Sequence, residues 1–193
     1  MPHVIEPAAS GRAHCRGCGA AIARAELRFG ERNPSPFGKG GEGEATMWFH
    51  LLCAAYKRPA TLLETLAALP MDAPLSAAER ERLERAARAS LAQRRIPRID
   101  GAERAPSGQA RCRACRQMIA RGAWRIRLVY FEEGRVTPGG SVHLACGRAY
   151  FESDALLERI LHFSPDLGLD ERAELTRAAE AEVAPDTPPA PAP

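Results

Sequence analysis

Aromatic residues are scarce in this chain of 193 residues, where phenylalanine, tryptophan and tyrosine together make up 6%. With so few large rings, neither half can build a large aromatic core, and small modules of this kind usually need a metal or disulfides to stay folded. No apolar stretch approaches the length of a membrane-spanning helix, and the N-terminus lacks the apolar core of a signal peptide. We therefore expect an intracellular chain in a reducing compartment, without a membrane partner.

Charge of one sign is not in large excess either, because the formal net charge is only +3. The charges are nevertheless unevenly distributed. Residues 10–58 contain eight Lys or Arg against four Glu, and residues 107–148 contain eight Arg against two Glu. The balancing acids lie in stretches with a helical pattern. The basic surface is therefore expected on two particular segments, which is typical of a polyanion partner.

Cysteine is absent outside two sets of identical local spacing, which use all six cysteines and two of the five histidines. A CxxC turn aims two sulfurs at one ion, and residues three apart share one face of a helix. Three thiolates and one imidazole close a tetrahedron around a structural Zn²⁺. The sequence therefore predicts two zinc ions per chain, held by two ligand sets: Cys15, Cys18, His50 and Cys53; and Cys112, Cys115, His143 and Cys146.

These ligand types also occur in two other kinds of site. Six cysteines can form disulfides or redox motifs, but the paired CxxC and HxxC spacing favours a metal. A catalytic zinc normally keeps an open coordination position, whereas four protein ligands leave none. We therefore predict structural zinc. Because no catalytic domain accompanies the two sets, we expect a sensor or recruitment factor and not an enzyme.

The segments that flank the ligands repeat as well. Ser107-Gly108-Gln109-Ala110 stands where Ser10-Gly11-Arg12-Ala13 stood, and the charged pattern that begins at Glu79 returns at Glu171. The repeat unit is thus a zinc module with a helical tail. We predict a flexible leader over 1–9, the first module with its tail over 10–93, a linker over 94–106, the second module with its tail over 107–183, and a disordered Pro/Ala-rich tail over 184–193.

Local patterns predict the elements of a small, metal-stabilised α+β fold. A strand should deliver His50, and a helix over 51–57 should end ahead of a proline. A short helix over 61–69 is followed by a longer one to residue 93, opened by the capping box of Ser76 and Glu79. Helices are expected over 144–152, 154–162 and 170–183. Trp48 and Trp124 are expected in the cores of the modules.

With ligands, flanks and tails in view, the chain resembles a tandem of PARP-type zinc fingers, modules that occur in poly(ADP-ribose) polymerase and DNA ligase III. The first copy carries the stronger signature. It has Ser10-Gly11-Arg12-Ala13 before the CxxC turn, Leu27-Arg28 after it, and Trp48-Phe49-His50-x2-Cys53. The resemblance implies recognition of DNA strand breaks without readout of the base sequence.

The resemblance also implies particular DNA contacts. Arg12 and Arg28 match the arginines that grip the phosphate backbone, and Phe37 lies where the family places an apolar residue against the exposed base pair. In the second copy Arg125 matches Arg28, whereas Gln109 replaces the other arginine. An arginine fork pairs with phosphate oxygens, and stacking on a base is worth roughly 1–3 kcal/mol. The alternatives are a solvated basic surface for the arginines and a loop residue folded back onto its module for the phenylalanine.

The prediction is a zinc-dependent DNA-binding protein that recognises nicks, gaps or ends of duplex DNA. It would work in the cytoplasm or nucleoid of a bacterium, or in the nucleus of a eukaryote. The main alternative is a zinc-stabilised protein-interaction adaptor without intrinsic DNA binding, whose helical tails dock a repair or transcription partner. A third reading is an enzyme subunit whose catalytic chain is separate.

Overall fold

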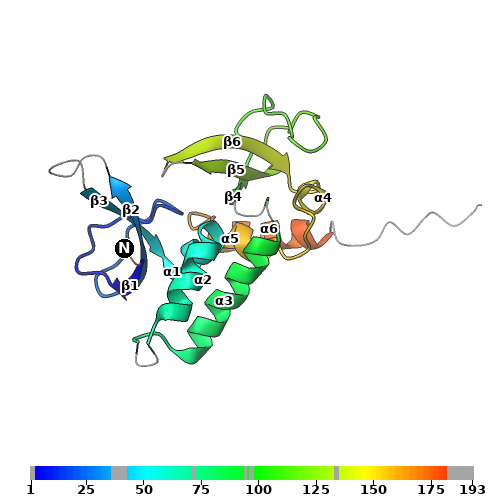
Figure 1. Ribbon diagram of the computed structural model, residues 1–193. Helices are drawn as coiled ribbons and strands as arrows, with labels where there is room; N and C mark the ends of the chain where they lie inside the picture. Colours follow the sequence, from blue (N-terminus) through cyan, green and yellow to red (C-terminus); the bar gives the residue numbers. More distant parts are fainter. Residues whose placement is uncertain are drawn as a thin grey trace, which may run out of the picture. The chain divides into compact units, whose positions relative to one another are not determined.

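The computed structural model describes residues 3–35, 43–70, 73–93, 95, 98–132 and 135–181. The chain divides into two compact units, residues 1–98 together with 130–137 and residues 99–129 together with 138–193. The described residues form two three-stranded sheets and six helices, shown in Figure 1. The expected small α+β class is confirmed, and the last strand of each sheet ends at the histidine of one predicted ligand set.

The first sheet has the order β1-β2-β3, with β1 at Val4–Pro7, β2 at Leu27–Ser35 and β3 at Gly43–His50. Both neighbouring pairs are antiparallel. Phe29 on β2 and Phe49 on β3 are register partners, and both are fully buried. Their rings lie 6.1 Å apart between centroids, and Ile22 in the preceding loop is equally buried.

The N-terminal segment corrects the expectation of a flexible leader over 1–9. Val4–Pro7 is the edge strand β1, and Val4 to Pro7 pair with Gly30 to Leu27 of β2. Ala8 is buried and exchanges backbone hydrogen bonds with the turn at Ala25 and Glu26. The module therefore begins ahead of residue 10, because its sheet needs this strand.

Three helices follow the first sheet, in the places that the sequence predicts. Helix α1 spans Leu51–Lys57, α2 spans Pro59–Ala68 and α3 spans Ala77–Ala92. Helix α2 begins two residues earlier than expected, because a proline is well tolerated in the first turn, where its missing N–H has no helical partner. The Ser76 hydroxyl accepts a hydrogen bond of 3.2 Å from the backbone N–H of Glu79, which confirms the N-cap of α3.

The second sheet has the order β4-β5-β6, with β4 at Ile99–Arg104, β5 at Trp124–Glu132 and β6 at Arg135–His143. Strand β4 lies inside the segment 94–106 that was expected to be a linker, so this expectation is corrected over residues 99–104. Gly101 has a φ of +89° beside an irregularity in the pairing of β4 with β5. A Cβ at this glycine would lie 2.1 Å from the carbonyl oxygen of Phe163, so the strand needs glycine here.

Two helices of the second unit are shorter than expected: α4 spans Gly147–Phe151 and α5 spans Leu157–His162. Helix α6 begins one residue earlier than expected and is described over Leu169–Ala181. Helix α4 begins three residues late because a tight turn occupies its predicted start. In that turn the backbone N–H of Cys146 donates to the carbonyl of His143. Within the described ranges, no helix is both long and apolar enough to cross a membrane.

The helical tails are structurally equivalent at matching positions. Leu83 on α3 and Leu175 on α6 are both buried beneath their helices. Arg80 donates a hydrogen bond to the carbonyl of Leu66 near the end of α2, and Arg172 donates to the carbonyl of Ser164, just beyond α5, at 2.8 Å. In each tail an arginine of the last helix thus adds a charged hydrogen bond to a carbonyl group near the end of the preceding helix.

Candidate metal centres

Both CxxC turns have the same backbone geometry. The residue after the second cysteine donates its N–H to the carbonyl of the first cysteine, from Gly19 to Cys15 at 2.8 Å and from Arg116 to Cys112 at 3.0 Å. This residue adopts a positive φ of +78° at Gly19 and +65° at Arg116. The turn folds the two sulfurs back toward one point. Glycine accepts that conformation without a steric penalty, whereas arginine does not.

The second ligand pair comes from the end of the hairpin. His50 is the last residue of β3, and α1 follows at once, so Cys53 lies in the first turn of that helix. His143 is the last residue of β6, and Cys146 immediately precedes α4. The backbone N–H of each histidine donates a hydrogen bond to the sulfur of the first cysteine, at 3.3 Å to Cys15 and 3.4 Å to Cys112. This bond holds the end of each hairpin beside its CxxC turn.

Each set of four ligand atoms lies within 4.8 Å of one another. In the first set, Nδ1 of His50 lies 3.4 Å from Sγ of Cys18 and 3.8 Å from Sγ of Cys53. The corresponding separations from Nδ1 of His143 are 3.4 Å to Cys115 and 3.9 Å to Cys146. Ordinary Zn–S and Zn–N bond lengths give a tetrahedron with S···N edges of about 3.5 Å. Both sets therefore match the dimensions of a tetrahedral zinc site.

The histidine rings are also oriented for metal binding. Nε2 of His50 lies 3.3 Å from the carbonyl oxygen of Ala21, and Nε2 of His143 lies 3.3 Å from that of Met118. A proton on Nε2 donates to this oxygen and leaves the Nδ1 lone pair directed at the thiolates. Such an outer hydrogen bond selects the tautomer and fixes the ring of a metal-binding histidine.

None of the six cysteines is in a disulfide, so the disulfide alternative is wrong. In the first set, hydrogen bonds from the side chains of Cys18 and Cys53 lower the pKa of Cys15 to about 3. Hydrogen bonding to Cys15 raises the pKa of Cys53 well above its ordinary value, and the hydrogen bond with Cys18 raises the pKa of His50. Cys15 is therefore ionised more readily than Cys53, and a bound cation displaces the proton of Cys53.

In the second set, the pKa values of the first and last cysteines shift in the same directions. Burial opposes ionisation of Cys112, but backbone hydrogen bonds from Cys115 and His143 outweigh it and lower the pKa of Cys112 to about 6. Burial is the main cause that raises the pKa of Cys146 to about 12, and a hydrogen bond with Cys115 is the next largest. Three thiolates and a neutral imidazole at these distances suit Zn²⁺. With four protein ligands and no open position, each centre fits a structural ion.

The two centres differ in their exposure to solvent. Cys15 and Cys53 are each 1% exposed, and the other two ligands of the first set are half-buried. In the second set only Cys112 is buried, and Cys115 is exposed. Glu26 lies near the first centre, with its Oε1 3.8 Å from Nε2 of His50, whereas the equivalent position of the second module is Ala123.

The arginines proposed by resemblance have unequal surroundings. Arg12 is exposed beside the first CxxC turn. Arg28 is buried, and its Nη2 lies 2.7 Å from Oε1 of Glu6 on the neighbouring strand. Arg125 is paired in the same way with Glu103, its Nε 3.0 Å from Oε1. The remaining proposed contact, Phe37, lies outside the described residues.

Sequence reasoning missed another group of arginines around the CxxC turns. All of these side chains are exposed: Arg16 and Arg24 in the first module, and Arg111, Arg113, Arg116 and Arg121 in the second. The signal was available, because residues 7–25 and 104–131 contain no aspartate or glutamate. The expected core positions are partly confirmed: Trp124 is buried, whereas Trp48 is half-buried with its ring against the Arg28 guanidinium.

These features define a class of protein: a zinc-finger-like chain with two Cys₃His modules, each joined to a helical tail. A scan of the chain against protein-family models gives no match, and a search of curated proteins gives no significant one. The metal centres therefore stand on the geometry of their own residues.

Proposed function

We propose that this chain is a zinc-dependent, non-enzymatic DNA-binding protein of the PARP-type finger class, which recognises nicks, gaps or ends of duplex DNA. The observation that supports this proposal best is the position of unbalanced positive charge. Arg12, Arg16 and Arg24 are exposed around the first metal centre, in a segment without acidic residues. Phosphate contacts of this kind position a protein on a duplex without reading its sequence.

The helical tails provide the contrast. On α3, Arg85 lies 3.3 Å from Glu81 and Arg88 lies 3.4 Å from Glu84, both as i, i+4 pairs. These charges largely neutralise each other on a solvated helix face. Arg12 and Arg16 have no such acidic neighbours in sequence, so they are available for an external polyanion.

Arg28 and Arg125, which are already paired with carboxylates, take a different part in this proposal. Arg28 can reach a phosphate only by exchanging Glu6 for it, and Arg125 only by exchanging Glu103. Arg12 is exposed, so a phosphate can approach it directly. Phe37 is proposed to cover the base pair exposed at a break, since such stacking tolerates any base.

Competition binding tests the proposal, using the zinc-loaded full chain and nicked, gapped, blunt-ended and intact duplexes of one sequence. We expect the broken duplexes to compete better than the intact one, and the affinity to fall steeply with salt as counterions are released. Arg12→Gln should weaken binding to every duplex, whereas Phe37→Ala should reduce the preference for the break. Equal binding of nicked and intact DNA would refute break recognition, and no binding to either would refute the DNA function.

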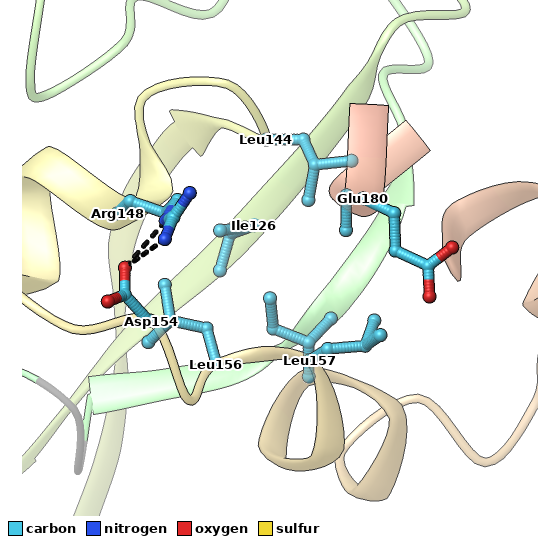
Figure 2. Close-up of a pocket in the computed structure, with 9 residues that line it drawn as sticks. Ile126, Leu144, Arg148, Asp154, Leu156, Leu157 and Glu180 are labelled. Atoms are coloured by element: carbon cyan, nitrogen blue, oxygen red, sulfur yellow. Dashed lines mark hydrogen bonds and ion pairs between the residues drawn. The ribbon is translucent and has the colours of Figure 1, made fainter. Parts of the chain in front are cut away.

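The adaptor is the second candidate, and one feature of the second unit favours it. An apolar pocket of about 170 Å³ opens between β5 and the helices of this unit, as Figure 2 shows. Its floor and walls are apolar, formed by Ile126, Leu144, Leu156, Leu157, Ile160 and Ala179. Arg148 and Asp154 form an ion pair at its edge. A pocket of this size accepts one apolar side chain of a partner protein.

The two candidates separate in one comparison. Ala179→Leu should fill the pocket and block an adaptor, but leave DNA binding unchanged. Arg12→Gln should weaken DNA binding but leave the binding of a partner protein unchanged.

A further inference from the structure

The CxxC turn of the second module carries more unbalanced charge than that of the first. Residues 104–131 contain seven arginines and no acidic residue. Arg104 pairs with Glu174, and Arg125 and Arg127 both pair with Glu103. Among the described residues, no ion pair joins Arg111, Arg116 or Arg121 to an acidic group. Within residues 104–131, the arginines Arg111, Arg116 and Arg121 therefore leave their charge unpaired in and around the CxxC turn.

The backbone forms a short hairpin whose turn carries Arg116, whose paired residues include Arg111, and beyond whose second strand Arg121 follows. Arg111 and Met118 face each other in an antiparallel bridge, and the N–H of Ile119 donates to the carbonyl of Ala110 at 2.8 Å. Nη1 of Arg111 lies 3.4 Å from the carbonyl oxygen of Arg116, so the Arg111 side chain runs along the turn toward Arg116. We call Arg111, Arg116, Met118 and Arg121 the knuckle surface.

Arg116 occupies a position that favours glycine. Its φ is +65°, and the equivalent residue of the first module is Gly19, with a φ of +78°. A side chain in the left-handed region is disfavoured, and residues held there concentrate at functional sites. The Arg116 side chain is exposed and does not pack in a core. Glycine would adopt this φ with less strain than arginine does. Stability of the fold therefore does not explain why an arginine occupies this position.

Met118 gives the same surface an apolar element. Its side chain is 45% exposed, although its neighbour Ile119 is fully buried. Its backbone carbonyl faces the ring of the metal ligand His143, so the metal centre fixes its place. A flexible, polarizable thioether between guanidinium groups suits contact with sugar and base surfaces next to phosphates.

From these observations we propose that the second module binds the phosphate backbone of DNA through the knuckle surface. This inference rests on the proposed DNA function, and it assigns the second module a grip that does not use Gln109 or Arg125. The three arginines form hydrogen bonds to phosphate oxygens, and Met118 packs against the adjoining sugar. The ligand is a nucleic acid, because the surface carries guanidinium groups, which pair with phosphates, and no carboxylates. A protein surface of mixed charge would need carboxylates here to pair with its own basic groups.

Arg116→Gly tests the proposal most directly, because folding and binding should respond in opposite directions. Glycine removes the backbone strain at this position. The thermal midpoint of the zinc-loaded full chain should therefore stay equal or rise. Its affinity for duplex DNA should fall. The variant Arg111→Gln/Arg116→Gly/Arg121→Gln should lose at least tenfold in affinity at moderate salt. The slope of log K against log salt should decrease by about 0.9 for each lost phosphate contact.

Arg177→Gln is the matched control, because it removes an exposed arginine from α6 of the same unit. Its affinity should stay close to that of the wild type. If the wild type binds DNA and the triple variant keeps its affinity and salt slope, the knuckle surface is not the grip, although the proposed function stands. An equal loss in Arg177→Gln would also overturn the proposal, by showing a response to net charge alone. A wild type that binds no DNA would overturn both.

Discussion

Arg28 and Glu6 face each other across β1 and β2, with Nη2 of the arginine 2.7 Å from Oε1 of the glutamate. The guanidinium carbon of Arg28 also lies 3.4 Å from the centre of the Trp48 ring. Arg125 and Glu103 occupy the same register positions in the second sheet. An arginine held in this way ties an edge strand to its sheet. A phosphate can use it only by displacing the glutamate.

The first prediction concerns stability. Glu6→Gln should lower the free energy of unfolding of the first unit by about 1 kcal/mol, a modest value because the Glu6 side chain is 42% exposed and solvent screens the pair. Chemical denaturation of the zinc-loaded protein measures this change. Glu81→Gln on α3 is the control, since its pair with Arg85 is exposed on both sides and is worth only about 0.2–0.5 kcal/mol. Equal losses in both variants would show that the Glu6–Arg28 pair stabilises the protein no more than an exposed helix pair does.

The second prediction concerns DNA affinity. Glu6→Gln removes the competitor for Arg28, so binding to nicked duplex should become several-fold tighter, and Arg28→Ala should weaken it. In the double variant Glu6→Gln/Arg28→Ala the gain should disappear, because the freed guanidinium is its source. Fluorescence anisotropy at fixed salt measures all three. A gain that persists in the double variant would contradict the exchange of glutamate for phosphate.

The third prediction concerns the metal. Elemental analysis should find two zinc ions per chain, and a chelator should remove them in two phases. The fast phase should come from the second centre, where Cys115 is exposed, and the slow phase from the first, where Cys15 and Cys53 are buried. Each loss should unfold its own module, because the binding energy of a structural zinc is folding energy.

Single-ligand variants assign the two phases. Cys115→Ser should abolish the fast phase, and Cys18→Ser should abolish the slow one. The reverse assignment would show that exposure of the ligands does not control release of the ion.

The metal ligands could be predicted from sequence because their spacing encodes their geometry. A CxxC turn and an HxxC pair place donors locally, and the hairpin has only to bring the two pairs together. Helix α1 was predicted at its observed bounds for a similar reason, since His50 precedes it and a proline follows it.

The edge strands could not be predicted in this way. Strand β1 is four residues long and ends in proline, and β4 contains Gly101, so neither shows the alternation of a strand. Gly101 is needed because the backbone of Phe163 passes close to it, and that contact joins residues 62 positions apart. With β1 and β4 missed, Glu6 and Glu103 were missed as partners. The DNA contacts assigned to Arg28 and Arg125 by resemblance therefore took no account of these two carboxylates.

The fourth prediction tests the arginines that join the helices of each tail. Arg80→Ala removes a donor to the carbonyl of Leu66, and Arg172→Ala removes donors to the carbonyls of Ser164 and Leu167. Hydrogen bonds from a charged donor contribute about 1.5–3 kcal/mol each. Each variant should destabilise its own unit by a value in that range, measured by thermal unfolding. Arg85→Ala is the control, and an equally small effect in all three would exclude a capping role.

The fifth prediction concerns the apolar pocket of the second unit (Figure 2). Ala179→Leu adds three carbon atoms to a side chain that lines the pocket of about 170 Å³. Each buried methylene contributes about 0.8 kcal/mol, so the variant should gain about 1–2 kcal/mol in stability and show a higher thermal midpoint. Ala173→Leu on the same helix, where the side chain is exposed, should gain nothing. If Ala179→Leu instead lowers the midpoint, the pocket cannot take a leucine side chain. The adaptor reading would then lose the structural feature that favours it.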